Sequence, residues 1–220
     1  MRRLLGIRYG NIESFLIVVI YFLCAGIYLH SYIKYAPSSS NFDSSWWGWL
    51  DQSRYIRETI AWSHGDLRPS QHWYLPLYPF LGVPFLLITP KNPYFIPDIL
   101  CLVASCYLFL RIVSKFSYCF PYLRLIATVS FFIPWFCSGY GCLSWVQPWT
   151  TTLSTPLLLA LILSSIKFYE SRKAKYAFLC GSVWGLLLMT RPTEAVWISI
   201  PSIFFCIYTV VVFKQPIKQK

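Results

Sequence analysis

The chain reads FLIVVIYFLCAGIYLHSYI over residues 15–33, without a single Lys, Arg, Asp or Glu. A helix of roughly 20 apolar residues is what crosses the hydrocarbon core of a bilayer. Comparable apolar runs recur at 74–89, 94–110, 120–137, 151–166, 176–190 and 195–213. The whole chain is 56% hydrophobic and only 12% charged, which is unlike a soluble domain. The sequence therefore predicts an all-α integral membrane protein, with residues 1–220 as a single membrane domain.

The run 74–89 differs from the other six, because Pro76, Pro79 and Pro84 interrupt it. Each interior proline removes a backbone hydrogen bond that lipid cannot replace. We expect residues 74–90 to form an interfacial or re-entrant segment and the other six runs to be transmembrane helices. The first run could also be a secretory signal, but its length, and the absence of a clear pair of small residues after it, favour an uncleaved helix.

The distribution of charge explains the net charge of +11. In the six-helix arrangement one side carries only two acids, Glu13 and Glu170, and most of the basic residues. These are Arg2, Arg3, Arg8, Arg111, Lys115, Arg124, Lys167, Arg172, Lys173, Lys175, Lys214, Lys218 and Lys220. Basic residues concentrate on the cytoplasmic side of membrane proteins. The sequence therefore predicts cytoplasmic N- and C-termini, a bacterial inner membrane location and no nucleic-acid partner.

A seven-helix arrangement with an exterior N-terminus places a similar number of basic residues inside. It exports the cluster of Arg2, Arg3 and Arg8, and it requires the proline-rich run 74–89 to span. Both features favour the six-helix arrangement.

The long first outer loop, residues 35–73, is expected to contain an amphipathic helix over residues 46–64. Trp49, Ile56 and Ile60 share one face with Ser53, and four charged residues lie toward another, namely Asp51, Arg54, Arg57 and Glu58. Tryptophans at 46, 47, 49 and 62 suit the headgroup level. This pattern predicts a helix that lies in the membrane interface. A second outer loop covers residues 138–149.

Three places in the outer loops could carry chemistry. Asp51 is either an acid that interacts with a helix dipole or a general base at the membrane surface, with Arg54 and Tyr55 on its face. His72 and Tyr78 either belong to a proline-set turn or contact a phosphate or sugar. Arg191 either pairs with Glu194 or grips a lipid phosphate with its guanidinium group.

Together these residues resemble the N-terminal half of the GT-C membrane glycosyltransferases, the class that includes protein O-mannosyltransferases and lipid A aminoarabinose transferases. The resemblance is carried by WWGWLDQSRY at 46–55, by Ala61 and Gly65-Asp66-Leu67, by HWYLPLYP at 72–79, and by GSVWGLLLMTRPT at 181–193.

The resemblance implies that Asp51 is the catalytic carboxylate and that Arg191 lies near the donor phosphate. The donor would be a polyprenyl-phosphate-linked sugar, and a hydroxyl group would accept the sugar. Arg68, His72, Tyr55, Tyr78 and Gln147 are the further residues expected at the substrate.

The chain departs from the family pattern in two respects. Gln147 stands where the family often has an acid, so a divalent metal cofactor is left open. Family members usually continue through more helices, so we expect a truncated or split enzyme, inactive alone, that works with a partner membrane chain. The non-enzymatic alternative is a multi-pass subunit or degenerate remnant that binds a membrane lipid or a membrane partner.

Overall fold

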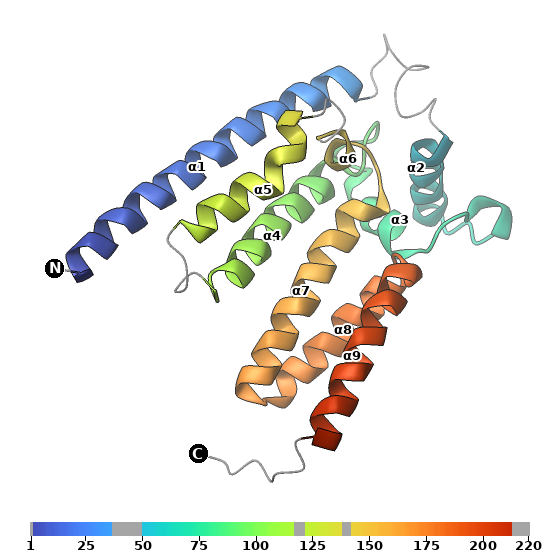
Figure 1. Ribbon diagram of the computed structural model, residues 1–220. Coiled ribbons are helices and arrows are strands. Elements are labelled where there is room, and N and C mark those ends of the chain that lie inside the picture. Colours follow the sequence, from blue (N-terminus) through green and yellow to red (C-terminus); the bar gives the residue numbers. More distant parts are fainter. Residues whose placement is uncertain (1, 37–49, 117–121, 138–141, 213–220) are drawn as a thin grey trace.

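The computed structural model describes residues 2–36, 50–116, 122–137 and 142–212. Their regular structure is entirely helical (Figure 1). The helices are α1 (Arg2–Tyr35), α2 (Leu50–Ser63), η2 (Pro69–Gln71), α3 (Leu77–Gly82), η3 (Val83–Phe85), α4 (Phe95–Val113), α5 (Leu123–Cys137), α6 (Leu143–Val146), α7 (Thr150–Ser171), α8 (Ala174–Leu188) and α9 (Pro192–Val212). Trp46, Trp47 and Trp49 of the predicted interfacial helix lie outside the described residues, as do residues 138–141 of the second outer loop.

Three helices are long and apolar enough to cross a membrane, by length and composition: residues Asn11–Tyr35 of α1, all of α4 and all of α7. The expectation of an all-α protein, integral to a membrane, is thus supported. Two further predicted spans form shorter apolar helices, α5 and α8, of 15 residues each. A span needs about 17 residues at the least, so the count of six transmembrane helices stays a prediction.

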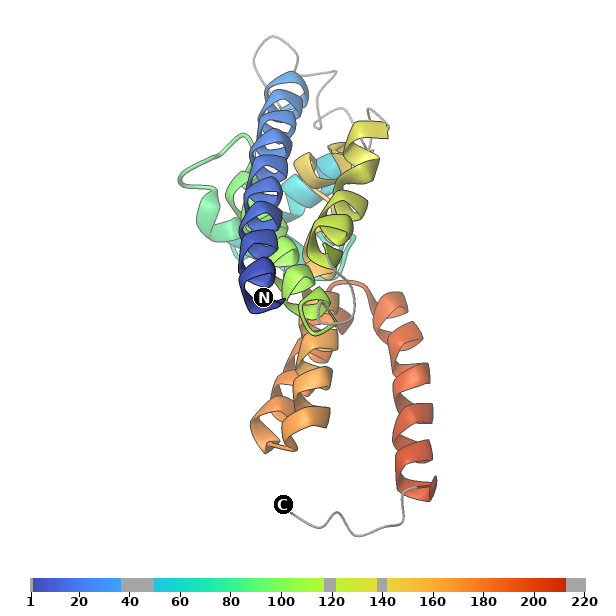
Figure 2. The same ribbon diagram turned by 60° about the vertical axis from the view of Figure 1, so that its left-hand side comes forward.

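The helices pack in two groups that meet along α4 and α7. On one side α1 lies along α5, which packs against α4, and on the other α8 and α9 follow α7 (Figure 1). Figure 2 shows that α9 diverges from α7 and α8 as it leaves the turn that precedes it. Buried side chains of α1, α5 and α6 form the core of the first group: Cys24, Tyr28, Phe132, Trp135, Cys142 and Val146.

The two ends of this bundle differ in character. The start of α1, the end of α4, the start of α5 and the α7–α8 turn lie at one end, while α2 and α3 lie at the other (Figure 1). At the first end Arg124 reaches Glu13 at 2.8 Å, and Lys115 reaches Glu170 at 2.7 Å. These basic residues belong to the side predicted to be cytoplasmic, so the fold separates them from α2 as the six-helix arrangement requires.

Residues 74–90 form α3, η3 and turns instead of one continuous helix. Pro79 and Pro84 each fall within a short helical piece, where they limit how far the helix extends. Gly82 packs so closely on α2 that an added Cβ atom would lie 3.0 Å from Thr59 Cγ2. The segment is therefore a folded cap held against α2. Its placement at the membrane interface stays a prediction.

The end of α2 is fixed by Gly65, which adopts a left-handed backbone with φ of +66°. The Asp66 N–H donates to the Ala61 carbonyl at 3.0 Å, and the Gly65 N–H donates to the Trp62 carbonyl at 3.1 Å. This pair of bonds is a Schellman motif, which turns the chain back along the helix it has just left.

Gly65→Ala should lower the free energy of unfolding by about 1 kcal/mol, because a Cβ atom disfavours the left-handed region. Gly26→Ala is the matched control, since neither glycine has an atom within 4 Å of an added Cβ and Gly26 lies within a regular helix. Thermal unfolding in detergent would compare the two variants. Equal melting temperatures would contradict the proposed role of Gly65.

Candidate functional site

The site forms where the segment after α2 folds back along that helix. Tyr55, Ile56, Tyr78 and Tyr94 are buried together there. The Tyr78 ring stacks on Tyr94 at 4.4 Å between centroids and meets Tyr55 edge-on at 5.4 Å. The Thr59 hydroxyl bonds to the Tyr94 hydroxyl and donates to the Pro79 carbonyl at 3.0 Å. This aromatic layer joins α2, α3 and the start of α4 into one rigid support.

Asp51 lies in the first turn of α2 and is exposed. Its Oδ1 accepts a hydrogen bond of 2.6 Å from the Tyr74 hydroxyl, and the Tyr74 ring stacks on Tyr55 at 4.2 Å. Burial and the bond to Asp51 raise the pKa of Tyr74 to about 12. Tyr74 therefore remains a hydrogen-bond donor at neutral pH, and it holds the Asp51 carboxylate in place.

Arg191 lies at the turn between α8 and α9, at the same end of the bundle as Asp51. The Leu77 N–H donates to the Met189 carbonyl at 3.4 Å, which ties this turn to α3. Burial raises the pKa of Tyr55, the hydrogen bond to Thr150 opposes this, and the charges of Asp51 and Arg191 act on it in opposite directions. The fold thus brings Asp51 and Arg191 to the same end of the bundle, although they are far apart in the sequence.

The Arg191 guanidinium lies 3.1 Å from the Glu194 carboxylate, and each side chain is 32% exposed. This ion pair with Glu194 is one of the two alternatives expected for Arg191; the other is the binding of a lipid phosphate. A partly exposed ion pair of this kind is weak. The guanidinium group therefore keeps N–H groups that could donate hydrogen bonds to a phosphate.

Tyr78 lies at the centre of the support instead of at its surface. Its hydroxyl donates to Asp98 Oδ1 at 3.0 Å and accepts from the Trp149 N–H at 2.9 Å. Both Tyr78 and Asp98 are fully buried. Asp98 was not among the predicted site residues, although an acid inside the apolar run 94–110 was a visible signal.

Glu58 corrects the sequence-based prediction for α2. It was assigned to the charged face of an amphipathic helix, but it is 0% exposed. Its Oε2 accepts from the Tyr74 N–H at 3.2 Å, and its Oε1 lies 3.5 Å from His72 Nδ1. The helical pattern alone assigned Glu58 to the solvent because the covering segment, residues 72–74, comes later in the chain.

The remaining predicted substrate residues lie around this core. His72 Nε2 lies 2.6 Å from the Asp66 carbonyl oxygen, so both ring nitrogens of His72 face protein groups. Arg68 is exposed and makes paired hydrogen bonds with Asp66. Gln147 is buried where α6 ends, at the end of the bundle that holds α2. A direct substrate contact by any of the three stays a prediction.

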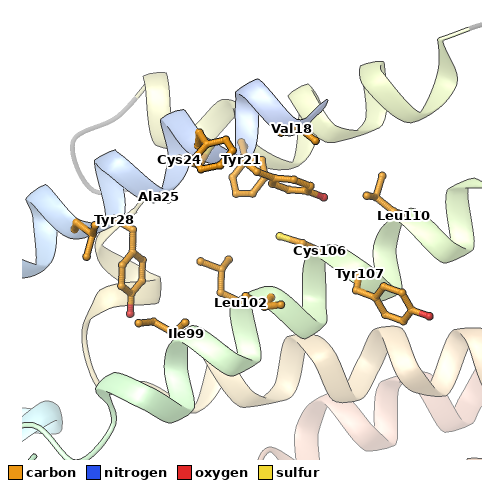
Figure 3. Close-up of a pocket in the computed structure, with 14 residues that line it drawn as sticks. Val18, Tyr21, Cys24, Ala25, Tyr28, Ile99, Leu102, Cys106, Tyr107 and Leu110 are labelled. Carbon is orange, nitrogen blue, oxygen red and sulfur yellow. The ribbon is translucent and has the colours of Figure 1, made fainter. Parts of the chain in front are cut away.

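A separate apolar groove of about 630 Å³ runs between α1 and α4. Figure 3 shows Tyr21 and Tyr28 of α1 facing Leu102 and Ile99 of α4 across it. Its remaining lining is Val18, Phe22, Cys24, Ala25, Leu29, Val103, Cys106, Tyr107, Leu110 and Phe132. The groove lies between two helices that can span a membrane, so its surface suits a hydrocarbon chain.

Within the described part of the chain, no group of three or more His, Cys, Asp and Glu side chains is placed to hold a metal ion. The surroundings of Asp51 instead offer tyrosine hydroxyls and a guanidinium group. This donor set does not fit a divalent metal.

Comparisons of the chain with protein-family models, with curated proteins and with solved structures find no match.

Tyr78→Phe should lower the free energy of unfolding by about 2–3 kcal/mol, because it leaves the buried Asp98 carboxyl and the Trp149 N–H without their partner. Tyr107→Phe is the matched control, since Tyr107 is exposed on α4. Thermal unfolding in detergent should separate the two variants clearly. If both melt with the wild type, the polar junction at Tyr78 does not stabilise the fold.

Proposed function

We propose that the chain is a membrane glycosyltransferase that moves a sugar from a polyprenyl-phosphate donor to a hydroxyl acceptor at the outer face of the membrane. The observation that carries the proposal is that Asp51 and Arg191 lie at one end of the bundle, where the Leu77–Met189 hydrogen bond ties the turn of Arg191 to the segment whose Tyr74 hydroxyl holds Asp51. A carboxylate for the acceptor and a cation for the phosphate are the two groups that such a transfer needs.

In the proposed reaction, Asp51 takes the proton of the acceptor hydroxyl. The acceptor oxygen attacks the anomeric carbon of the sugar, and the bond between that carbon and the phosphate oxygen breaks. The bonding electrons leave with the lipid phosphate. Arg191 stabilises the negative charge that develops there, once the phosphate replaces or joins Glu194 as its partner.

The supporting side chains have separate tasks in this proposal. Tyr74 donates to Asp51 and orients it, and the Tyr55 ring supports Tyr74 by stacking on it. The Tyr78 ring packs edge-on against the Tyr55 ring and so fixes its position. Arg68, His72 and Gln147 remain candidates for contacts with the sugar or phosphate.

The membrane arrangement that we propose has six transmembrane helices, α1, α4, α5, α7, α8 and α9, with α2 in the first outer loop. Both termini then lie in the cytoplasm, in keeping with the basic residues that gather away from α2. We place the protein in a bacterial inner membrane, where it would work with a partner membrane chain.

The groove between α1 and α4 favours a second function, that of a non-catalytic subunit or degenerate remnant that holds a membrane lipid. The groove is apolar, and several of its side chains, such as Phe22 and Val103, are exposed. A subunit of this kind would bind lipid without turnover.

A topology reporter should show the exterior after residue 70 and the cytoplasm after residue 118, because the first lies beside α2 and the second between α4 and α5. Enzymatic reporters that are active on only one side of the membrane would measure this. A cytoplasmic result at residue 70 would remove both the six-helix arrangement and the outer-face site.

Asp51→Asn should lower transfer at least about 100-fold, since the general base is lost. Arg191→Gln should lower it by about the same factor, because the leaving phosphate loses its cation. The assay follows release of label from a radiolabelled polyprenyl-phosphate hexose, with the protein in liposomes and a simple alcohol as acceptor.

Lys115→Gln is the control, because it removes a charge from the opposite end of the bundle, where Lys115 pairs with Glu170. Transfer that survives Asp51→Asn would exclude Asp51 as the base. Donor binding without any turnover in the wild-type chain would favour the lipid-binding subunit.

A further inference from the structure

Two buried polar atoms face each other at Glu58 and His72. Glu58 Oε1 and His72 Nδ1 are 3.5 Å apart, and neither has a hydrogen-bond partner elsewhere in the described residues. The other carboxylate oxygen of Glu58 accepts from the Tyr74 N–H. Glu58 therefore holds the turn 72–74 at two points, through a side chain and through the backbone.

The neighbours of His72 determine how many protons the pair carries. The Asp66 carbonyl can only accept, so His72 Nε2, at 2.6 Å from it, carries a hydrogen. Nδ1 then has either a lone pair or a second hydrogen. A bare Nδ1 opposite a bare carboxylate would place two acceptors against each other without water. One proton between Nδ1 and Oε1 removes that conflict and leaves the pair neutral overall.

The consequence reaches Asp51 through Tyr74. The Tyr74 backbone is bonded to Glu58, and the Tyr74 hydroxyl is bonded to Asp51 at 2.6 Å. Trp73, between His72 and Tyr74, lies against Arg54 of α2, with the guanidinium carbon 5.8 Å from the ring centroid. The turn 72–74 is thus the connection between the buried pair and the exposed acid.

We propose that Glu58 is a positioning residue: its proton-bridged pair with His72 holds the turn 72–74 on α2 and so places the Tyr74 hydroxyl on Asp51. The importance of this for catalysis rests on the proposed function, but the coupling between Glu58 and Asp51 does not. Removal of the shared proton turns the contact into a repulsive one and releases the turn.

The direction of the pH dependence follows from burial. Burial raises the pKa of Glu58, although the bonds from Tyr74 and His72 oppose this. A group whose pKa is raised on folding contributes stability at low pH and loses it as the pH rises through the raised pKa. The other titratable or charged groups around the pair are Asp66 and Arg68, which pair with each other, and the Tyr94 hydroxyl.

The test is a double-mutant cycle read by ¹⁹F NMR from 3-fluorotyrosine placed at position 74. Asp51→Asn should shift the fluorine resonance in the wild-type background, because it changes the partner of the hydroxyl. The same substitution should have little effect in a Glu58→Leu background, where the turn is released. Glu170→Leu, which removes an exposed acid from the opposite end, should leave the Asp51 effect intact.

Glu58→Gln is a second variant, which keeps the proposal testable if Glu58→Leu does not fold. Its amide can donate to a bare His72 Nδ1 and its carbonyl can still accept from the Tyr74 N–H. The Asp51 effect should survive in this variant, and the part of the pH titration at position 74 that belongs to the pair should disappear. If wild type and Glu58→Gln titrate alike, or if the Asp51 effect persists in Glu58→Leu, the proposal is wrong.

Turnover separates this inference from the proposed function. In an active protein, Glu58→Leu should lower kcat about tenfold with little change in KM, and Glu58→Gln should restore most of the loss. Coupling seen by NMR in a chain without transferase activity would support the positioning role and overturn the proposed function. Transferase activity without this coupling would support the proposed function and overturn the positioning role of Glu58.

Discussion

Two carboxylates that lie out of reach of water, on Glu58 and Asp98, control how the α2 end of the bundle is built. A buried carboxyl group without partners is costly, so each must be met by a donor. Glu58 accepts a hydrogen bond from the Tyr74 N–H and lies beside His72, in the turn after η2. Asp98 accepts a hydrogen bond from the Tyr78 hydroxyl. Because these donors lie on residues 72–78, this segment is fixed against both α2 and α4. The exposed groups that it contacts are held in place as a result.

The helical framework could be predicted from hydropathy, because each membrane span is one continuous apolar run of the sequence. The apolar runs correspond to α1, α4, α5, α7, α8 and α9, and the prolines of 74–90 correctly indicated that this run would not form one long helix. Such elements need no knowledge of what packs against them.

The candidate site was less accessible from the sequence, because its geometry depends on contacts between distant segments. Charge distribution alone placed Asp51 and Arg191 on the same side, but the hydrogen bond from Tyr74 that holds Asp51 could not be foreseen. Glu58 and Tyr78 show the limit most clearly. Helical periodicity put Glu58 toward water, and Tyr78 was expected at a ligand, whereas long-range hydrogen bonds make both of them internal supports.

The short turn between α7 and α8 bears on the biogenesis of the protein. Only Arg172 and Lys173 separate the two helices, and Cys180 of α8 donates to Ser164 of α7 at 3.2 Å. With 15 residues, α8 is too short to partition well into a bilayer alone. In the proposed six-helix arrangement we therefore expect the pair to enter the membrane together, as a helical hairpin. The basic residues of its turn stay on the side of synthesis and set the direction of insertion for α9.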